Sequence, residues 1–135
     1  MITTIEGSGS DPIRILLIED NEANRRLMSD YLGYCGYEVF ALAEGTQIAE
    51  TLEQFRPQII LLDLKLPMID GYVLLEQLQQ RDDWKQIPTI VVSAYAFQRD
   101  QQRALDLGAR RYLVKPIRLS QLTDVIREEL GDPPD

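Results

Sequence analysis

Five polar residues of this sequence lie directly after short apolar runs, and together they could bind a divalent cation and handle a phosphoryl group. They are Glu19, Asp20, Asp63, Ser93 and Lys115. Clustered carboxylates repel one another, and a hard cation such as magnesium, which prefers oxygen ligands, removes that conflict. The ammonium and hydroxyl groups could then contact phosphoryl oxygens. Asp63 is best placed as a nucleophile, because an aspartyl phosphate is a known type of covalent intermediate.

Taken one at a time, these residues have more ordinary explanations. Asp20 could cap a helix, Ser93 could belong to a turn, and Lys115 could be a solvated surface charge. In a parallel sheet, however, the carboxyl ends of all strands lie at one edge, where open α/β folds bind their ligands. The coincidence of five such residues at predicted strand ends therefore favours one shared site.

The composition narrows the chemistry that the chain can perform. Its 135 residues carry 14 Lys and Arg against 22 Asp and Glu, and the net charge of −8 disfavours binding to nucleic acid or to anionic membranes. The absence of histidine from the sequence excludes a histidine base and a Ser-His triad. The single cysteine, Cys35, excludes an internal disulfide bond. With no secretory signal and no apolar run near the ~20 residues of a spanning helix, we expect a cytoplasmic protein.

Apolar runs alternate with amphipathic segments, and this alternation predicts the elements that would position the five residues. Strands are predicted over residues 13–18, 37–42, 59–62, 89–92 and 112–114. Helices are predicted over about 22–34, through 48–55, from 71 to 78, over about 97–107 and over about 119–130, with a polar loop at 81–86. Five strands and five helices in alternation indicate an α/β fold with a doubly wound, five-stranded parallel sheet. Residues 1–11 are expected to be a flexible leader, 12–131 one domain, and 132–135 a short tail.

The chain resembles the receiver domain of bacterial two-component response regulators over residues 13–130. The motifs that carry the resemblance occur in order: Glu19-Asp20-Asn21, Asp63-Leu64-Lys65-Leu66-Pro67 with Asp70-Gly71, Ser93-Ala94, Gly108-Ala109, and Tyr112-Leu113-Val114-Lys115-Pro116. The resemblance implies the flavodoxin-like strand order 2-1-3-4-5. It also implies a single-domain regulator of the chemotaxis or cell-cycle kind, which is not an enzyme beyond its own aspartyl phosphorylation and slow dephosphorylation.

The resemblance assigns a role to each matching position. Asp63 corresponds to the phospho-acceptor. Asp20, Asp63 and the backbone carbonyl of Lys65 correspond to direct magnesium ligands, and Glu19 to a ligand that reaches the ion directly or through water. Ser93 corresponds to the switch hydroxyl and Lys115 to the lysine that binds the phosphoryl group. Tyr112 corresponds to the aromatic residue whose ring moves inward on activation. The Lys115–Pro116 bond is at a position where the family often has a cis peptide.

Some positions depart from the commonest pattern of the family. Glu19 replaces the more usual aspartate, and Ser93 stands where threonine is frequent. Lys65 and Tyr95 occupy two positions that influence how water reaches the phospho-aspartate. Our hypothesis is that both side chains hinder that water, so that the phosphoryl group persists for minutes or longer.

The resemblance also implies partners. The phosphoryl donor would be a sensor histidine kinase or a histidine phosphotransfer domain, which docks on the first helix around Asn24, Arg25 and Met28. An effector protein downstream would read the signal, and phosphorylation could convert a monomer into a dimer. The surface expected to contact the effector comprises Tyr95, Gln98, Gln102, Arg111, Tyr112 and Arg118.

Three alternatives belong to other functional classes. A pseudo-receiver would keep the fold as a phosphorylation-independent interaction module, which the complete set of site residues disfavours. A haloacid-dehalogenase-like phosphatase would need a second aspartate two residues after Asp63, where this chain has Lys65. A flavodoxin-like flavin binder would need a hydroxyl-rich phosphate loop after the first strand, where Glu19 and Asp20 would repel phosphate.

Overall fold

The computed structural model describes residues 11–132, and its centre is one sheet of five parallel strands. The strands are β1 (Arg14–Ile18), β2 (Glu38–Leu42), β3 (Ile59–Leu62), β4 (Thr89–Ser93) and β5 (Arg111–Val114). Their order across the sheet is β2-β1-β3-β4-β5, which confirms the predicted order. All residues of β3 and β4 are buried, because strands in the middle of such a sheet are covered on both faces.

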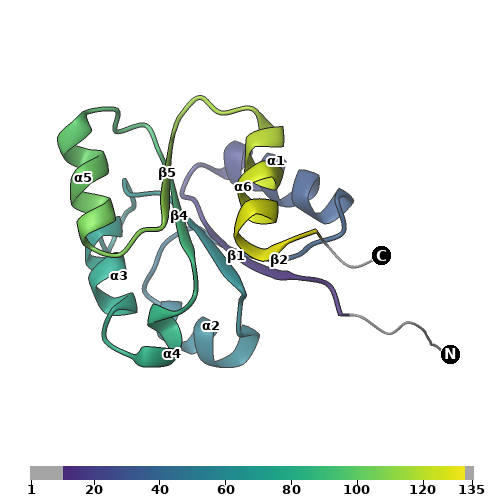
Figure 1. Cartoon of the computed structure of the whole chain (residues 1–135), viewed down its shortest axis with the longest axis horizontal. Coiled ribbons are helices and arrows are strands. Elements are labelled where there is room, and N and C mark those ends of the chain that lie inside the picture. The colour runs from purple at the N-terminus through teal and green to yellow at the C-terminus, as the bar shows by residue number, and fades with distance from the viewer. Residues whose placement is uncertain (1–10, 133–135) are drawn as a thin grey trace, which may run out of the picture.

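Helices cover both faces of the sheet (Figure 1). Helices α1 (Glu22–Tyr34) and α6 (Leu119–Leu130) lie on one face, where Met28, Leu32 and Leu122 join a core cluster with Leu17 and Leu61. The helices α2 (Ile48–Phe55), α3 (Gly71–Leu78) and α5 (Gln98–Asp106) belong to the other face. The strands therefore supply two separate apolar cores, as a doubly wound sheet requires.

A sixth helix corrects the prediction of five helices. The segment predicted as a polar loop contains α4 (Asp82–Lys85), a single turn that begins with two acidic residues, which the helix dipole favours. Trp84 anchors this turn by packing against the core cluster of the α2 and α3 face. Four residues are too few to produce a helical periodicity in the sequence, so the pattern could not reveal this turn.

The buried face of helix α1 differs from the predicted face at one residue, Leu27. The sequence pattern places both Leu27 and Met28 on its inner face, but Leu27 is 55% exposed and Met28 is buried. Met28 is therefore a core residue, and Leu27 is an apolar side chain that α1 presents outward.

The predicted leader and tail lie almost entirely outside the described residues. Only Asp11 of the leader and Asp132 of the tail fall within them. Within residues 11–132, none of the helices combines the length and the apolar character that crossing a membrane would need.

The register of the strands brings the predicted site residues to one level. Ile18 pairs with Leu62 between β1 and β3, so that Glu19 and Asp63 leave the sheet side by side. Ser93 pairs with Val114 between β4 and β5, so that Lys115 leaves the sheet beside Ser93. The carboxyl edge of the sheet thus collects residues that are distant in sequence.

Candidate functional site

The segment after β1 carries two carboxylates and is held in place at both ends. The amide of Glu19 continues the sheet by donating to the carbonyl of Leu42 at 3.0 Å. Asn21 caps α1, because its side chain accepts a hydrogen bond from the amide of Asn24 at 2.9 Å. Glu19 is buried and Asp20 is exposed, so the two neighbouring carboxylates have different surroundings.

The segment after β3 carries Asp63 and then turns back toward the sheet. The amide of Asp63 donates to the carbonyl of Ile18 at 3.0 Å, and its Oδ1 accepts from the amide of Lys65 at 3.2 Å. Helix α3 begins next to this segment, since the amide of Gly71 donates to the carbonyl of Leu64 at 2.9 Å. A Cβ atom at Gly71 would lie 2.5 Å from Leu64 Cα and 2.7 Å from the Asp63 carbonyl oxygen.

We expect Gly71→Ala to lower the free energy of unfolding by about 2 kcal/mol, because the added methyl group would overpack against the backbone that carries Asp63. Gly33→Ala is the matched control, since a Cβ atom there meets nothing within 4 Å and α1 should gain up to about 1 kcal/mol from the better helix former. Urea unfolding of both variants checks this. Equal stability of the two variants would contradict the close approach.

Lys115 joins the two segments. Its Nζ donates to Asp63 Oδ2 at 2.9 Å and to Glu19 Oε1 at 2.6 Å. Burial alone would lower the pKa of Lys115, but the hydrogen bonds and charges of Glu19 and Asp63 outweigh burial and raise it. Burial raises the pKa of Glu19, and the charge of Asp63 adds to this, against the hydrogen bonds from Lys115 and the Asn21 amide. The Lys115–Pro116 peptide bond is cis, as the resemblance implied.

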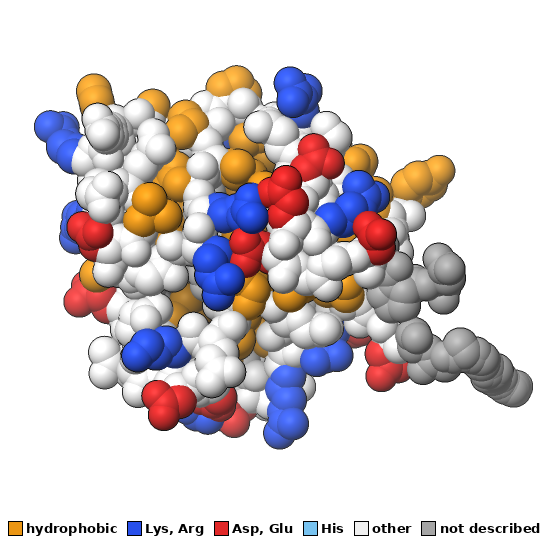
Figure 2. Space-filling model, in the orientation of Figure 1, with side chains coloured by type: hydrophobic (Ala, Val, Ile, Leu, Met, Phe, Trp, Pro, Cys, Tyr) orange, Lys and Arg blue, Asp and Glu red, His pale blue; other side chains and the backbone are white. Residues whose placement is uncertain are grey.

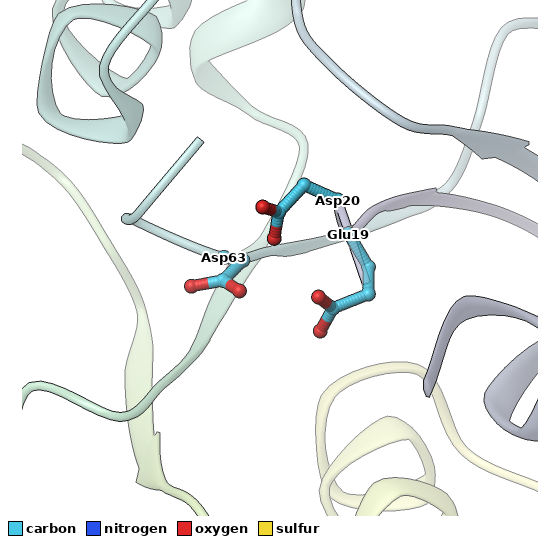
Figure 3. Close-up of side chains that lie close together, drawn as sticks. All are labelled: Glu19, Asp20 and Asp63. Carbon is cyan, nitrogen blue, oxygen red and sulfur yellow. The ribbon is translucent and has the colours of Figure 1, made fainter. Parts of the chain in front are cut away.

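The three carboxylates face a common space (Figure 3), with Glu19 and Asp20 on one segment and Asp63 on another. One oxygen of each lies within 4.8 Å of the others. Lys115 compensates one of the three negative charges. A small hard cation with oxygen ligands fits this donor set, because it would offset the remaining charge.

Ser93 and Tyr112 lie on the other side of the site and are linked through Tyr95. The Ser93 hydroxyl accepts a hydrogen bond from the amide of Tyr95 at 3.1 Å, and Ser93 is buried. The Tyr112 hydroxyl donates to the carbonyl of Tyr95 at 2.7 Å. Burial raises the pKa of Tyr112, so the hydroxyl keeps its proton at neutral pH. The segment between β4 and α5 is therefore held by one hydrogen bond with β4 and one with β5.

The remaining predicted surface residues differ in how free their side chains are. Gln98, Gln102 and Arg118 are exposed, whereas Arg111 is half-buried. Arg111 binds Glu128 and donates from Nε to Glu129 Oε2 at 2.7 Å. The structure thus does not present Arg111 as a free cation, because α6 neutralises it. Lys65 is exposed at the rim.

Tyr72 connects α3 to α5, which sequence reasoning did not anticipate. Its buried hydroxyl lies 3.3 Å from the carbonyl of Asp100 and 3.4 Å from Asp100 Oδ1. The guanidinium of Arg103 lies 3.9 Å from the centre of the Tyr72 ring, which is a cation–π contact. Ala104 is the only buried residue of α5, so these contacts supply much of the attachment of that helix.

Burial and the negative charge of Asp100 raise the pKa of Tyr72 to about 12, from an ordinary value of 10.0. Because the folded protein holds this proton more tightly than the unfolded chain, its contribution to stability is complete below pH 10 and is lost as the pH rises toward 12. Between pH 10 and 12 the unfolding free energy of the wild-type protein should therefore fall as the pH rises. We expect Tyr72→Phe to make this fall less steep, by up to about 1.4 kcal/mol per pH unit. Urea unfolding across this pH range measures it. Tyr34→Phe, at a residue that is 92% exposed, should leave the slope unchanged, and parallel curves for the two variants would exclude the effect.

The chain matches the family model described as the response regulator receiver domain over residues 15–127. It is 32% identical over 121 residues to the polar-differentiation response regulator DivK of Brucella anthropi, which covers 90% of this chain and 98% of that protein.

Two solved structures show the same likeness. The receiver domain of a sensor histidine kinase from Pseudomonas aeruginosa, which has a magnesium ion coordinated in its active-site cleft, is 32% identical with a TM-score of 0.81, over 89% of this chain and 98% of that one. A CheY-like receiver domain protein from Methanospirillum hungatei is 30% identical with a TM-score of 0.79, over 87% and 93% of the two chains.

Proposed function

The chain belongs to the response regulator receiver domain family, and from this premise we propose that it accepts a phosphoryl group on Asp63 in a magnesium-dependent reaction. The donor would be a phosphohistidine on a sensor histidine kinase or on a histidine phosphotransfer domain. The observation that carries the proposal is the Lys115 ammonium, which binds Asp63 and Glu19 beside the Asp20 carboxylate. Proteins of this family signal through histidine kinases and effectors, and we expect this one to do so in the cytoplasm.

The reaction moves the phosphoryl group from nitrogen to oxygen. A carboxylate oxygen of Asp63 attacks phosphorus, the P–O bond forms, and the P–N bond to the donor imidazole breaks, with its electron pair staying on that imidazole. The Lys115 ammonium then moves from the Asp63 carboxylate to a phosphoryl oxygen. Its ion pair with the phosphoryl group replaces its ion pair with Asp63. A bound magnesium ion supplies positive charge to the phosphoryl oxygens. Backbone hydrogen bonds from Glu19 to Leu42 and from Asp63 to Ile18 hold the two carboxylate segments at the sheet edge, so Asp63 is already positioned for the attack.

The magnesium ligands would be Asp20, Asp63 and the backbone carbonyl of Lys65, with Glu19 as a more distant partner. Both oxygens of Glu19 already have donors, Lys115 on Oε1 and the Asn21 amide at 3.0 Å on Oε2. This supports contact between Glu19 and the ion through water.

The conformational response would follow from Ser93 and Tyr112. A phosphoryl group on Asp63 offers new acceptors to the Ser93 hydroxyl, which would turn toward it. The Tyr95 segment, bonded to both Ser93 and Tyr112, would move with it. Phosphorylation would thus shift the population between two arrangements of the β4–α5 segment.

An apolar cavity lies beside the site, and we expect the phosphoryl donor to dock there. It has a volume of about 410 Å³ and lies between α1 and the segment after β5, lined by Leu27, Met28, Pro116, Ile117 and Leu119 together with Lys115. A donor must reach Asp63, so a helix seated here would be close enough to deliver its phosphohistidine. Leu27 would be the main apolar contact of the predicted docking helix, because it is exposed, whereas Met28 lines the cavity but is buried.

The face formed by α5, β5 and α6 would contact the downstream effector. In the centre of this face, basic and acidic side chains alternate over β5 and α6 (Figure 2). The ion pairs between β5 with its preceding residue and α6 join Arg110 and Arg111 to Glu128 and Glu129. Because these charges are paired within the chain, contacts would come mainly from Gln98, Gln102 and Arg118, with Tyr95 and Tyr112 reporting the phosphorylation state.

The phosphoryl group is expected to persist for minutes or longer, because Lys65 and Tyr95 would hinder the attacking water at the rim. Tyr95 is half-buried against the core of the α3 face and Lys65 is exposed. The decay of purified phosphoprotein, followed by intact mass, measures this lifetime. Loss of the group within seconds would contradict the hindrance.

The proposed function is tested by incubating the protein with an acyl phosphate and magnesium and measuring its intact mass. We expect a gain of one phosphoryl group with magnesium and none with EDTA. A protein that gains no mass with magnesium, although it stays folded by circular dichroism, would instead be a pseudo-receiver.

A further inference from the structure

Arg25 contacts the backbone that carries two of the three carboxylates. Its Nη1 donates to the carbonyl of Glu19 at 2.9 Å and lies 3.3 Å from the carbonyl of Asp20. The side chain is half-buried. One guanidinium therefore contacts two consecutive backbone carbonyls, those of Glu19 and Asp20. The side chains of these two residues form the carboxylate cluster with Asp63 (Figure 3).

Helix geometry explains how Arg25 reaches this segment. Arg25 lies in the first turns of α1, which begins at Glu22 and is capped by Asn21. Side chains of a helix lean toward its N-terminus. The guanidinium therefore lies over the β1–α1 segment instead of beside the helix.

The stability of α1 does not account for a cation at this place. The N-terminal end of a helix carries a partial positive charge, which disfavours Arg and favours an acid such as Glu22. The side chain of the neighbouring Arg26 is exposed and makes neither of these two contacts. The contact of Arg25 is therefore specific to its position on the helix.

We propose that Arg25 is a positioning residue for the divalent-cation site, which fixes the backbone at Glu19 and Asp20 so that the Asp20 carboxylate faces Asp63. This inference rests on the proposed function, because it concerns the cation which that function requires. Partners that orient metal ligands typically change metal affinity by about 10-fold to 100-fold when they are removed.

Two physical effects of removing Arg25 have opposite signs, which makes the test decisive. Loss of a positive charge near the site would by itself strengthen the binding of a dication. Loss of the contact with the two carbonyls would weaken binding, because Asp20 would no longer be held in place. The direction of the change in affinity therefore separates positioning from general electrostatics.

The experiment compares Arg25→Gln with Arg26→Gln, which removes the same charge from the adjacent residue. Titration calorimetry with magnesium chloride, at constant ionic strength and without any phosphoryl donor, gives the dissociation constant of each. We expect Arg25→Gln to raise it about 10-fold and Arg26→Gln to leave it unchanged or slightly lower. Arg25→Lys, which keeps the charge and a donor, should recover part of the affinity.

Each outcome of this titration has one meaning. An Arg25→Gln variant that binds magnesium as well as Arg26→Gln, or better, overturns the positioning role. If the wild-type protein binds no magnesium, the proposed function fails instead. Circular dichroism in EDTA checks that each variant is folded. If Arg25→Gln is unfolded, the magnesium affinity of Arg25→Lys decides the question. Weaker binding than that of the wild-type protein supports the positioning role, and equal binding overturns it.

Discussion

Asp63→Asn is expected to abolish the gain of a phosphoryl group when the protein is incubated with magnesium and an acyl phosphate. The asparagine amide has nearly the same shape as the carboxylate but is not a nucleophile, so the loss should be complete rather than partial. The fold should survive, because Glu19 remains as a partner for Lys115. Intact mass measured over time, with wild-type protein in parallel, checks this.

Asp70→Asn is the matched control for this prediction. Asp70 is exposed and caps α3 by accepting a hydrogen bond from the amide of Tyr72 at 2.8 Å, a role that asparagine fills equally well. This variant should gain the phosphoryl group like the wild-type protein. Phosphorylation of the Asp63→Asn variant at the wild-type rate would place the acceptor elsewhere.

Lys115→Met is expected to lower the free energy of unfolding by about 3 kcal/mol when no divalent cation is present. The change leaves Glu19 and Asp63, both buried, without the ammonium that pairs with them, and removing one partner of a buried ion pair is costly. Saturating magnesium should restore most of the loss, because the ion supplies the missing positive charge. Magnesium should also bind more tightly than to the wild-type protein.

Urea unfolding in EDTA and in magnesium chloride measures both parts of this prediction. Lys85→Met removes an exposed lysine at the end of α4 and should change stability by no more than about 0.5 kcal/mol in either condition. A loss for Lys115→Met that is the same with and without magnesium would show that the lysine and the cation do not act on the same carboxylates.

The strands and the meeting of Glu19, Asp63 and Lys115 could be predicted from the sequence for one physical reason. Buried parallel strands require continuous apolar runs, and their shared direction brings the residues that follow them to one edge. The strand order could be stated only through the resemblance to a family. Helix α4 could not be predicted, because its single turn is set by the packing of Trp84 rather than by a repeating pattern.

Contacts that depend on side-chain direction were also beyond the sequence. Leu27 and Met28 are adjacent apolar residues, and only the orientation of α1 on the sheet decides which is buried. Arg111 could be assigned to a surface, but its pairing with α6 depends on how closely that helix approaches β5. The resemblance assigned Arg25 only to the docking helix, and its contact with the carbonyls of Glu19 and Asp20 could not be predicted from the sequence, because it depends on where its side chain points.

The most direct measurement is to locate the phosphoryl group on the chain. Protein treated with magnesium and an acyl phosphate would be reduced with borohydride, which converts a phosphorylated carboxyl group into an alcohol, and then digested for tandem mass spectrometry. The geometry around Lys115 predicts a single reduced side chain, at position 63. Reduction at Glu19 or Asp20 instead, or no reduced side chain in folded protein, would contradict phosphoryl transfer to Asp63.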